Sequence, residues 1–508
     1  MENVINLVQN LQTGEIKLLR HFYKFQKDND CKKINLLFDL AIKYKNCIKL
    51  DEIDKRVFNE LYPANSKNEI NFSKLKCRLK NDIVNILLLQ TSSTKFKAKH
   101  DLAIFDCRRM LLQGEILLGR GIYSEGITIL EKASSIAQKN ELFAEQILID
   151  ELCRNYNLLK SGEKVFSSFM KRIETNTSLL EKVQFAKYFH YEMTAAKLFK
   201  TANTHPMEEW GAKLQIIKED HEKSKSVKIG FYYKLSALNY YREMHQFDKS
   251  LEFGLALLKN AEHYEILKTP YYSGKINMEL AKCFLLTEDY EKAIHHANIS
   301  NNYFEKDILN ELASLEILLY CYLMKQDFNK VNSIMEKAFI KVSMQPNEFI
   351  YSKWCFLKAG VEFRMNDFPE ALKSLKSCTE LLKDKNGWLM AYNLFEAICR
   401  IENGNVEWFE YRGDALKKMI QRYNNGHASG QNKRFYLIYK ILRTLHKNCY
   451  DYVQTIADEI ENLKILSEIS YSYSLYMSGY EPIQFDRWIK EKAENQLKNK
   501  KGKSKLVA

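Results

Sequence analysis

Two adjacent histidines, His295 and His296, have side chains of a type that could bind a metal or transfer protons. They lie in the stretch "TEDYEKAIHHANIS" (287–300), after an acidic turn. If this stretch is helical, successive side chains point about 100° apart, whereas two ligands of one metal normally lie three or four residues apart. We therefore interpret both histidines as polar side chains on a solvated helix face. A metal or acid–base role and a contact with a partner are the alternatives.

Glycine-rich stretches could bind phosphate or another anion. "GRGIYSEG" (119–126) and "SGEKVFSS" (161–168) superficially resemble phosphate-binding loops. Such a loop needs a preceding strand and a helix whose N-terminus faces the anion, but the residues before the first stretch have a helical pattern. "NNGHASGQNKR" (424–434) could hold an anion on backbone amides beside Lys433 and Arg434. In each case an ordinary turn between helices is the simpler interpretation.

The remaining signatures of catalysis are absent from the sequence. It has no nucleophile elbow, no catalytic Cys/His signature, no paired zinc motif and no kinase signature. The 11 cysteines are odd in number and form no CxxC pair, which favours small buried side chains in a reducing compartment. The sequence therefore predicts no catalytic residue, no cofactor and no metal, and a protein that is not an enzyme.

Composition favours a helical, cytoplasmic protein. Only 6 prolines and 18 glycines interrupt 508 residues, too few for the turns of an all-β protein. No apolar run approaches the roughly 18 residues that span a bilayer. The first residues, "MENVINLVQNLQTGEIKLL", read as an amphipathic helix and lack the layout of a signal peptide.

The net charge of +13 allows a nucleic acid or an acidic protein as partner. Much of the surplus is local, because residues 487–508 carry eight Lys or Arg against two Glu. We expect this segment to be a disordered basic tail. "SKLKCRLK" (73–80) places four further cations along one helix, a pattern that suits either a phosphate-binding surface or a solvated face.

A repeated pattern organises most of the chain. Several segments show the end of an apolar helix, a short polar turn, an aromatic residue and a second helix. The aromatic residues are Tyr123, Phe247, Tyr290, Phe328 and Phe368. The last four follow one another at intervals of 43, 38 and 40 residues. Extrapolation by units of about 41 residues places further turns near Lys164, Pro206, Val406 and His446.

These units resemble tetratricopeptide repeats, with "LAKCFLLTEDYEKAI" (280–294) as the best match. The resemblance implies helix pairs that stack into an all-α solenoid, because one pair cannot bury its apolar face alone. The period near 40 exceeds the 34 of that family, and the proline that ends each repeat is mostly missing. A non-repetitive all-helical globule is the alternative. The whole arrangement also resembles multi-helical repeat proteins of Bacteroidetes-type bacteria.

The pattern predicts three parts. Residues 1–92 form a separate helical N-terminal domain, with Leu75, Leu79, Ile83 and Leu87 as an apolar stripe in a helix. Residues 100–480 form about eight helix pairs, and 487–508 form the basic tail. The polar stretch "TSSTKFKAKHD" (91–101) connects the first two parts.

In tetratricopeptide-like arrays the first helix of each pair lines the concave groove. Counting back from each aromatic residue predicts that the following residues face this groove: Arg108, Tyr232, Asn239, Arg242, Lys275, Lys282, Tyr320, Lys353 and Arg364. This basic and aromatic set suits an acidic peptide or a protein partner. The leading hypothesis is a non-enzymatic scaffold or adaptor without a membrane segment. The alternative is a nucleic-acid-linked regulator that uses the N-terminal helices and the basic tail.

Overall fold

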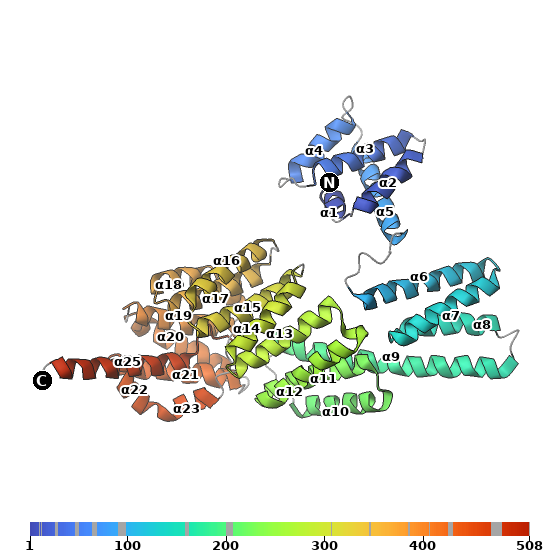
Figure 1. The fold of residues 1–508 in the computed structure, drawn as a ribbon. Coiled ribbons are helices and arrows are strands. Elements are labelled where there is room, and N and C mark those ends of the chain that lie inside the picture. The colour runs from blue at the N-terminus through green and yellow to red at the C-terminus, as the bar shows by residue number, and fades with distance from the viewer. Residues whose placement is uncertain are drawn as a thin grey trace. The chain divides into compact units, whose positions relative to one another are not determined.

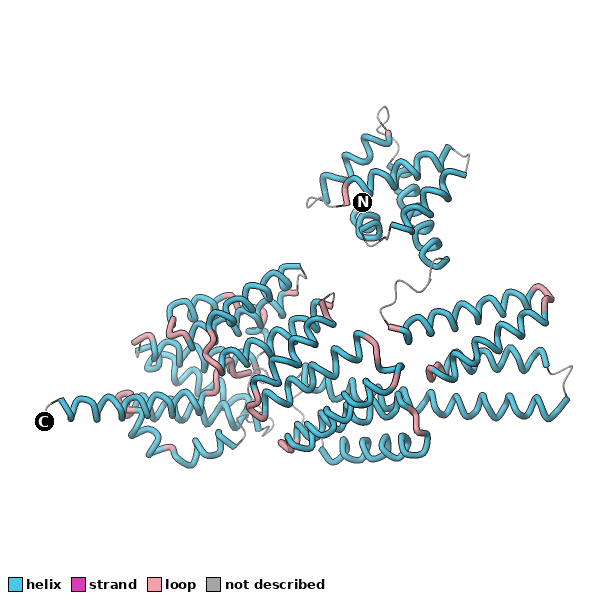
Figure 2. Tube along the Cα trace, in the orientation of Figure 1, coloured by secondary structure: helices cyan, strands magenta, loops and turns pink. Residues whose placement is uncertain are grey.

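Residues 1–506 are described by the computed structural model, apart from short gaps. The gaps are 10, 12, 26–28, 46–49, 63–68, 90–97, 158–161, 200–206, 306, 345–346, 385–386, 406, 425–429 and 469–479. The regular secondary structure of the described residues consists of helices, as Figure 2 shows. No helix in this part of the chain combines the length and the apolar character needed to cross a bilayer.

The chain divides into two compact units, Met1–Lys97 and Ala98–Ala508. Most of the polar connector expected at 91–101 lies outside the described residues. The first unit contains α1 (Glu2–Gln9), α2 (Thr13–Phe25), α3 (Asn29–Lys43), α4 (Leu50–Leu61) and α5 (Glu69–Leu89).

The first unit has a core of its own. Leu75, Leu79 and Ile83 of α5 are buried in it, as their spacing of four residues predicts. Phe38 of α3 and Val57 of α4 are completely buried in the same core. This unit therefore folds around side chains that it supplies itself.

The second unit consists mainly of helix pairs. The first helices of the pairs are α6 (Lys99–Gly119), α8 (Phe143–Asn157), α11 (Val227–Glu243), α13 (Pro270–Leu286), α15 (Ile308–Met324), α17 (Glu348–Arg364), α19 (Trp388–Glu402) and α21 (Gly430–Lys447). The second helices are α7 (Tyr123–Lys139), α9 (Gly162–Phe199), α12 (Phe247–His263), α14 (Tyr290–Tyr303), α16 (Phe328–Met344), α18 (Phe368–Lys376), α20 (Glu407–Asn424) and α22 (Tyr452–Asp458). Consecutive pairs pack on one another, so the unit is a tetratricopeptide-like α-solenoid (Figure 1).

The predicted aromatic residues mark the repeat correctly. Tyr123, Phe247, Tyr290, Phe328 and Phe368 are each the first residue of a second helix. The extrapolated position Val406 lies outside the described residues, and the turn expected near His446 comes later, because α22 begins at Tyr452. The turn expected near Pro206 lies outside the described residues.

One turn geometry recurs between the paired helices. Glu288 has a φ of 61°, and its amide donates to the Leu285 carbonyl at 3.2 Å. The amide of Asp289 donates to the Phe284 carbonyl at 2.9 Å, which completes a Schellman motif. The Asp289 carboxylate then caps the next helix by accepting from the Lys292 amide at 3.2 Å.

The same positive φ, two residues before the start of the second helix, occurs in other pairs. The equivalent residues are Gly121, His245, Gln326 and Asn366. The short connection reverses the chain, and the small buried residues Ala293 and Ala297 let α14 approach α13 closely. The short turn, together with the small residues where the two helices meet, explains why this sequence forms helix pairs.

The longest helix, α9, joins two parts of the array. Its first half contacts α8, where Arg172 pairs with the fully buried Asp150. Its second half contacts α11, where the rings of His190 and Tyr232 lie 6.3 Å apart. The next helix, α10 (Met207–Ser224), also packs on α11.

The C-terminal segment differs from the expected disordered tail. Helix α25 spans Phe485–Leu506 and follows α23 (Ile460–Glu468) in the described chain. Trp488, Ile489 and Ala493 of this helix are buried. Phe485, Trp488 and Ile489 form an apolar stripe at helical spacing, which the basic composition of the segment concealed. The first turns of α25, through Ala493, are therefore packed against the fold.

Candidate functional site

The predicted groove residues lie on first helices, but only part of them come together. Five lie on the neighbouring helices α11 and α13: Tyr232, Asn239, Arg242, Lys275 and Lys282. Arg108 lies on α6, Tyr320 on α15, and Lys353 and Arg364 on α17.

Three of these five residues surround one carboxylate, that of Glu279. Glu279 accepts from Arg242 at 2.8 Å, and the ammonium groups of Lys282 and Lys275 lie 3.0 and 3.4 Å away. The Arg242 guanidinium also donates to the side-chain oxygen of Asn239. We call Arg242, Lys275, Glu279 and Lys282 the Glu279 cluster. It contains three positive charges and one negative charge.

Burial within the Glu279 cluster is uneven. The side chains of Arg242 and Glu279 are 5% and 3% exposed, whereas those of Lys275 and Lys282 are 15% and 24% exposed. The arginine is thus held inside by the carboxylate, and the two lysines are partly exposed. A buried charge pair of this kind needs close geometry to offset the loss of hydration.

The charges in the Glu279 cluster shift one another's pKa. Burial alone would raise the pKa of Glu279, but the charges of Lys282, Arg242 and Lys275 hold it well below its usual range. Burial lowers the pKa of Lys282 to about 8, with Glu279 opposing this and the other two cations adding to it. The cluster therefore has an excess of positive charge that an anion would relieve.

A group of tyrosines adjoins the Glu279 cluster. Tyr191 comes from α9, Tyr232 from α11, and Tyr271 and Tyr272 from α13. Tyr191 and Tyr271 are 43% and 45% exposed, whereas Tyr232 is buried and burial raises its pKa. Burial raises the pKa of Tyr191, and the charges of Lys187 and Lys275 oppose this shift. Exposed tyrosine rings beside cations are typical of protein-binding surfaces.

The other predicted cations are paired with carboxylates. Arg108 pairs with Glu145 at 2.8 Å, and Lys353 pairs with Glu316 at 2.7 Å. Both pairs, like Arg242 and Glu279, join residues 37 apart on consecutive first helices. These acids are not among the residues predicted from the sequence, although their offset of nearly one repeat is a usable signal. Most of the basic character is therefore neutralised outside the Glu279 cluster.

The two adjacent histidines occupy different environments. His295 is exposed, as expected. His296 is half-buried, its ring stacks on Phe284 at 5.4 Å, and its Nδ1 lies 2.8 Å from the Asn277 side-chain oxygen. Burial lowers the pKa of His296. The position of the His296 side chain is therefore explained by packing and not by solvation. In the described residues no group of three His, Cys, Asp or Glu side chains is placed to bind a metal ion.

The glycine-rich stretches serve as turns or lie partly outside the described residues. Gly121 adopts a φ of 77° in the α6–α7 turn. Residues 158–161 and 425–429 are outside the described residues, and so is the side chain of Lys433. Arg434 is completely buried and pairs with Glu481 and Asp486, so its guanidinium already has anionic partners within the fold.

The basic run on α5 lies partly on the surface of the first unit. Lys74 and Arg78 are exposed. Lys76 instead pairs with Asp54 at 3.1 Å, and Lys80 is half-buried. Only part of the run is therefore available to a phosphate.

Comparison with known proteins found no matching family model and no matching curated protein. Three solved structures have a similar arrangement. The Rap protein complexed with competence and sporulation factor is 12% identical, with a TM-score of 0.41 over 73% of this chain and 99% of that chain. A signal-transduction ATPase with a tetratricopeptide repeat sensor, from Pyrococcus horikoshii, is 16% identical, with a TM-score of 0.38 over 84% and 66%.

Yeast Tom70 is 12% identical, with a TM-score of 0.32 over 92% of this chain and 97% of that chain. Similarities this low carry no conclusion about function. The helix pairs and their repeated turns define the fold.

Proposed function

We propose that this chain is a non-enzymatic scaffold or adaptor that binds an acidic segment of a protein or peptide partner at the Glu279 cluster and the neighbouring tyrosines. The observation that carries the proposal is the surplus of cations around a single buried carboxylate. Stacked helices hold these side chains on a rigid surface, so their positions are set before a partner arrives.

Each residue has a distinct role in this proposal. Glu279 holds Arg242 in place, while the more exposed Lys275 and Lys282 receive a carboxylate of the partner. Tyr191 and Tyr271 supply exposed aromatic area beside the cations. A bound anion would raise the pKa of Lys282 from about 8, so binding would take up protons at slightly alkaline pH.

A cytoplasmic setting is part of the same proposal. Nine cysteines in the described residues are free thiols, and seven of them are buried. A reducing compartment keeps such thiols in that state.

The proposal can be tested with labelled peptides. A short fluorescein-labelled peptide rich in Glu, and its Gln-substituted counterpart, would be titrated with the full chain by fluorescence anisotropy. The Glu peptide should bind more tightly, and Lys275→Met/Lys282→Met should weaken it about tenfold or more, since charge-assisted hydrogen bonds are lost. The matched control is Lys373→Met/Lys376→Met, which removes two exposed lysines from α18.

Two results would contradict the proposal. Equal binding of both peptides, or equal weakening by the control variant, would show that the Glu279 cluster does not select the partner. If only labelled DNA or RNA bound, with affinity falling steeply as salt is added, a nucleic-acid-linked function would replace it.

A further inference from the structure

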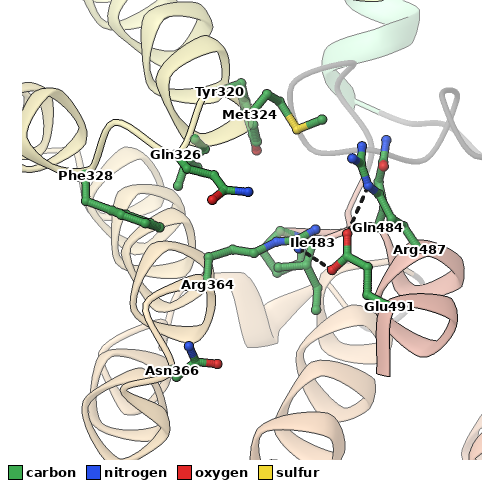
Figure 3. A pocket seen from close by; sticks show the side chains of 12 residues that line it. Tyr320, Met324, Gln326, Phe328, Arg364, Asn366, Ile483, Gln484, Arg487 and Glu491 are labelled. Carbon is green, nitrogen blue, oxygen red and sulfur yellow. Dashed lines mark hydrogen bonds and ion pairs between the residues drawn. The ribbon is translucent and has the colours of Figure 1, made fainter. Parts of the chain in front are cut away.

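A cavity of about 360 Å³ lies at the ends of α15 and α17, and none of the residues of the Glu279 cluster lines it. Figure 3 shows it between these two helices and the C-terminal segment. Tyr320 and Arg364, two of the predicted groove residues, both line it. Its volume falls within the range of roughly 300–1,000 Å³ that is usual for small-ligand sites.

Two arginines in the cavity share one carboxylate. Arg364 of α17 lies 3.0 Å from Glu491 of α25, and Arg487 lies 3.0 Å from the other oxygen of the same carboxylate (Figure 3). These three residues are the charged side chains of the lining, which therefore carries one net positive charge. A guanidinium has five N–H donors, so each arginine can serve a second acceptor as well as Glu491.

The ion pairs with Glu491 are accessible to a competitor. The side chains of Arg364, Arg487 and Glu491 are 30%, 48% and 43% exposed. Ion pairs in such surroundings contribute little net stability because water screens them. A ligand carboxylate can therefore replace or join Glu491 at small cost to the fold.

The rest of the cavity wall is apolar with a few amides. The apolar residues are Tyr320, Leu323, Met324, Phe328, Pro482 and Ile483. Gln326 and Asn366, the left-handed residues of two successive repeat turns, add amide groups beside Gln484. Equivalent turn positions and the C-terminal segment thus build a wall that combines apolar area with hydrogen-bonding groups, as ligand sites do.

We propose that this cavity binds a molecule with one carboxylate next to an apolar group, with Arg364 and Arg487 holding the carboxylate. Glu491 occupies the anion position in the absence of ligand. Charge complementarity supports this choice, since a monoanion balances the single net positive charge of the lining. A free organic acid and the C-terminal residue of a peptide share this chemistry. The inference concerns residues other than the Glu279 cluster and does not depend on the acidic-partner proposal.

The probes are N-acetylphenylalanine and its uncharged amide, titrated into the full chain by calorimetry. The acid should bind and the amide should bind at least about tenfold more weakly, because the amide cannot pair with the arginines. A third probe, an acetylated peptide that ends in Phe, distinguishes a free organic acid from the C-terminal residue of a peptide as the ligand. Tighter binding of this peptide than of the acid would indicate a peptide terminus as the natural ligand, and equal or weaker binding would indicate a free acid.

Three variants make the test specific. Arg364→Met should weaken binding of the acid about tenfold. If this variant is poorly folded, the affinity of Arg487→Met for the acid is measured instead. Glu491→Gln should tighten the acid about two- to fivefold, because it removes the competing carboxylate. Arg109→Met, which alters an exposed arginine on α6, is the matched control and should change nothing.

The increase in affinity for Glu491→Gln is the decisive result, since a merely structural role for Glu491 would not produce it. Equal binding of acid and amide would overturn the proposal. So would unchanged affinity for the acid in a well-folded Arg364→Met or Arg487→Met protein.

Discussion

Arg242 and Glu279 lie 37 residues apart in the sequence and 2.8 Å apart in the structure, and both side chains are almost completely buried. Their ion pair connects α11 to α13 across successive repeats. Lys275 and Lys282 complete the surroundings of the carboxylate. One acidic side chain thus keeps three cations together at the centre of the candidate site.

Glu279→Gln should strongly destabilise the second unit. The substitution leaves three cations without a counter-charge, and removing one partner of a buried ion pair costs about 3–5 kcal/mol. Urea unfolding followed by circular dichroism would measure the loss. Glu370→Gln, in an exposed pair with Lys373, should change the free energy of unfolding by less than about 1 kcal/mol. Equal effects of the two changes would contradict the buried role of Glu279.

Lys282 should give the free energy of unfolding a characteristic pH dependence. Its pKa is about 8 in the folded chain and 10.5 for an ordinary lysine, so the unfolded chain binds more protons between these values. Stability should therefore rise with pH over this window, by at most about 3 kcal/mol. Lys282→Met should remove that rise. The check is the difference between the unfolding free energies of variant and parent, measured from pH 7 to pH 10; a constant difference would refute the prediction.

The repeat turns allow a paired test of backbone strain. Gln326 is exposed with a φ of 58°, so Gln326→Gly should stabilise the fold by about 0.5–1 kcal/mol despite the added flexibility of the unfolded chain. Gly121 has a φ of 77°, and among the described residues no atom lies within 4 Å of the position of an added Cβ. Gly121→Ala should therefore cost about 1 kcal/mol through conformation alone. Thermal unfolding of both variants would show opposite signs if this account is right.

Arg434 should hold the start of the C-terminal segment in place. It is completely buried and pairs with Glu481 and Asp486, and it donates to the Leu466 carbonyl at 2.7 Å. Arg434→Met leaves two buried carboxylates without a cation, a change that costs about 3–5 kcal/mol. Hydrogen exchange of residues 480–493 should accelerate at least about a hundredfold. The control Arg412→Met, at an exposed position on α20, should leave this exchange unchanged.

The helix pairs could be predicted because each repeat shows the same local sequence pattern of apolar helix end, polar turn and aromatic residue. Tyr290 and Phe328 recur at nearly constant spacing, and each follows a short polar turn before a new helix. Ala293 and Ala297, four residues apart on α14, are both buried. His295 on the same helix is exposed as expected, whereas His296 stacks on Phe284 of the neighbouring helix. Helical periodicity predicts whether a residue lies on the buried or the exposed face of its helix. A side chain at the border between these faces, such as that of His296, can still pack against a neighbouring helix.

The C-terminal helix shows a second limit of sequence reasoning. The basic composition after Arg487 suggested disorder, yet Trp488 and Ile489 are buried and Arg364 of α17 pairs with Glu491. The ion pair of Arg364 with Glu491 joins positions 127 residues apart. No periodic signal within the segment could reveal such partners.

The sequence by itself determined the repeated helix pairs and the turns that precede Tyr123, Phe247, Tyr290, Phe328 and Phe368, because these depend on contacts within one repeat. Tertiary structure alone decided which charges meet. Arg242 and Lys353 were recognised as groove candidates from local spacing, but their carboxylate partners lie on adjacent repeats. The size of the surplus charge at Glu279, and the cavity at Arg364, follow from how repeats stack and where the C-terminal segment packs. Both are properties of distances between helices, which a linear pattern does not contain.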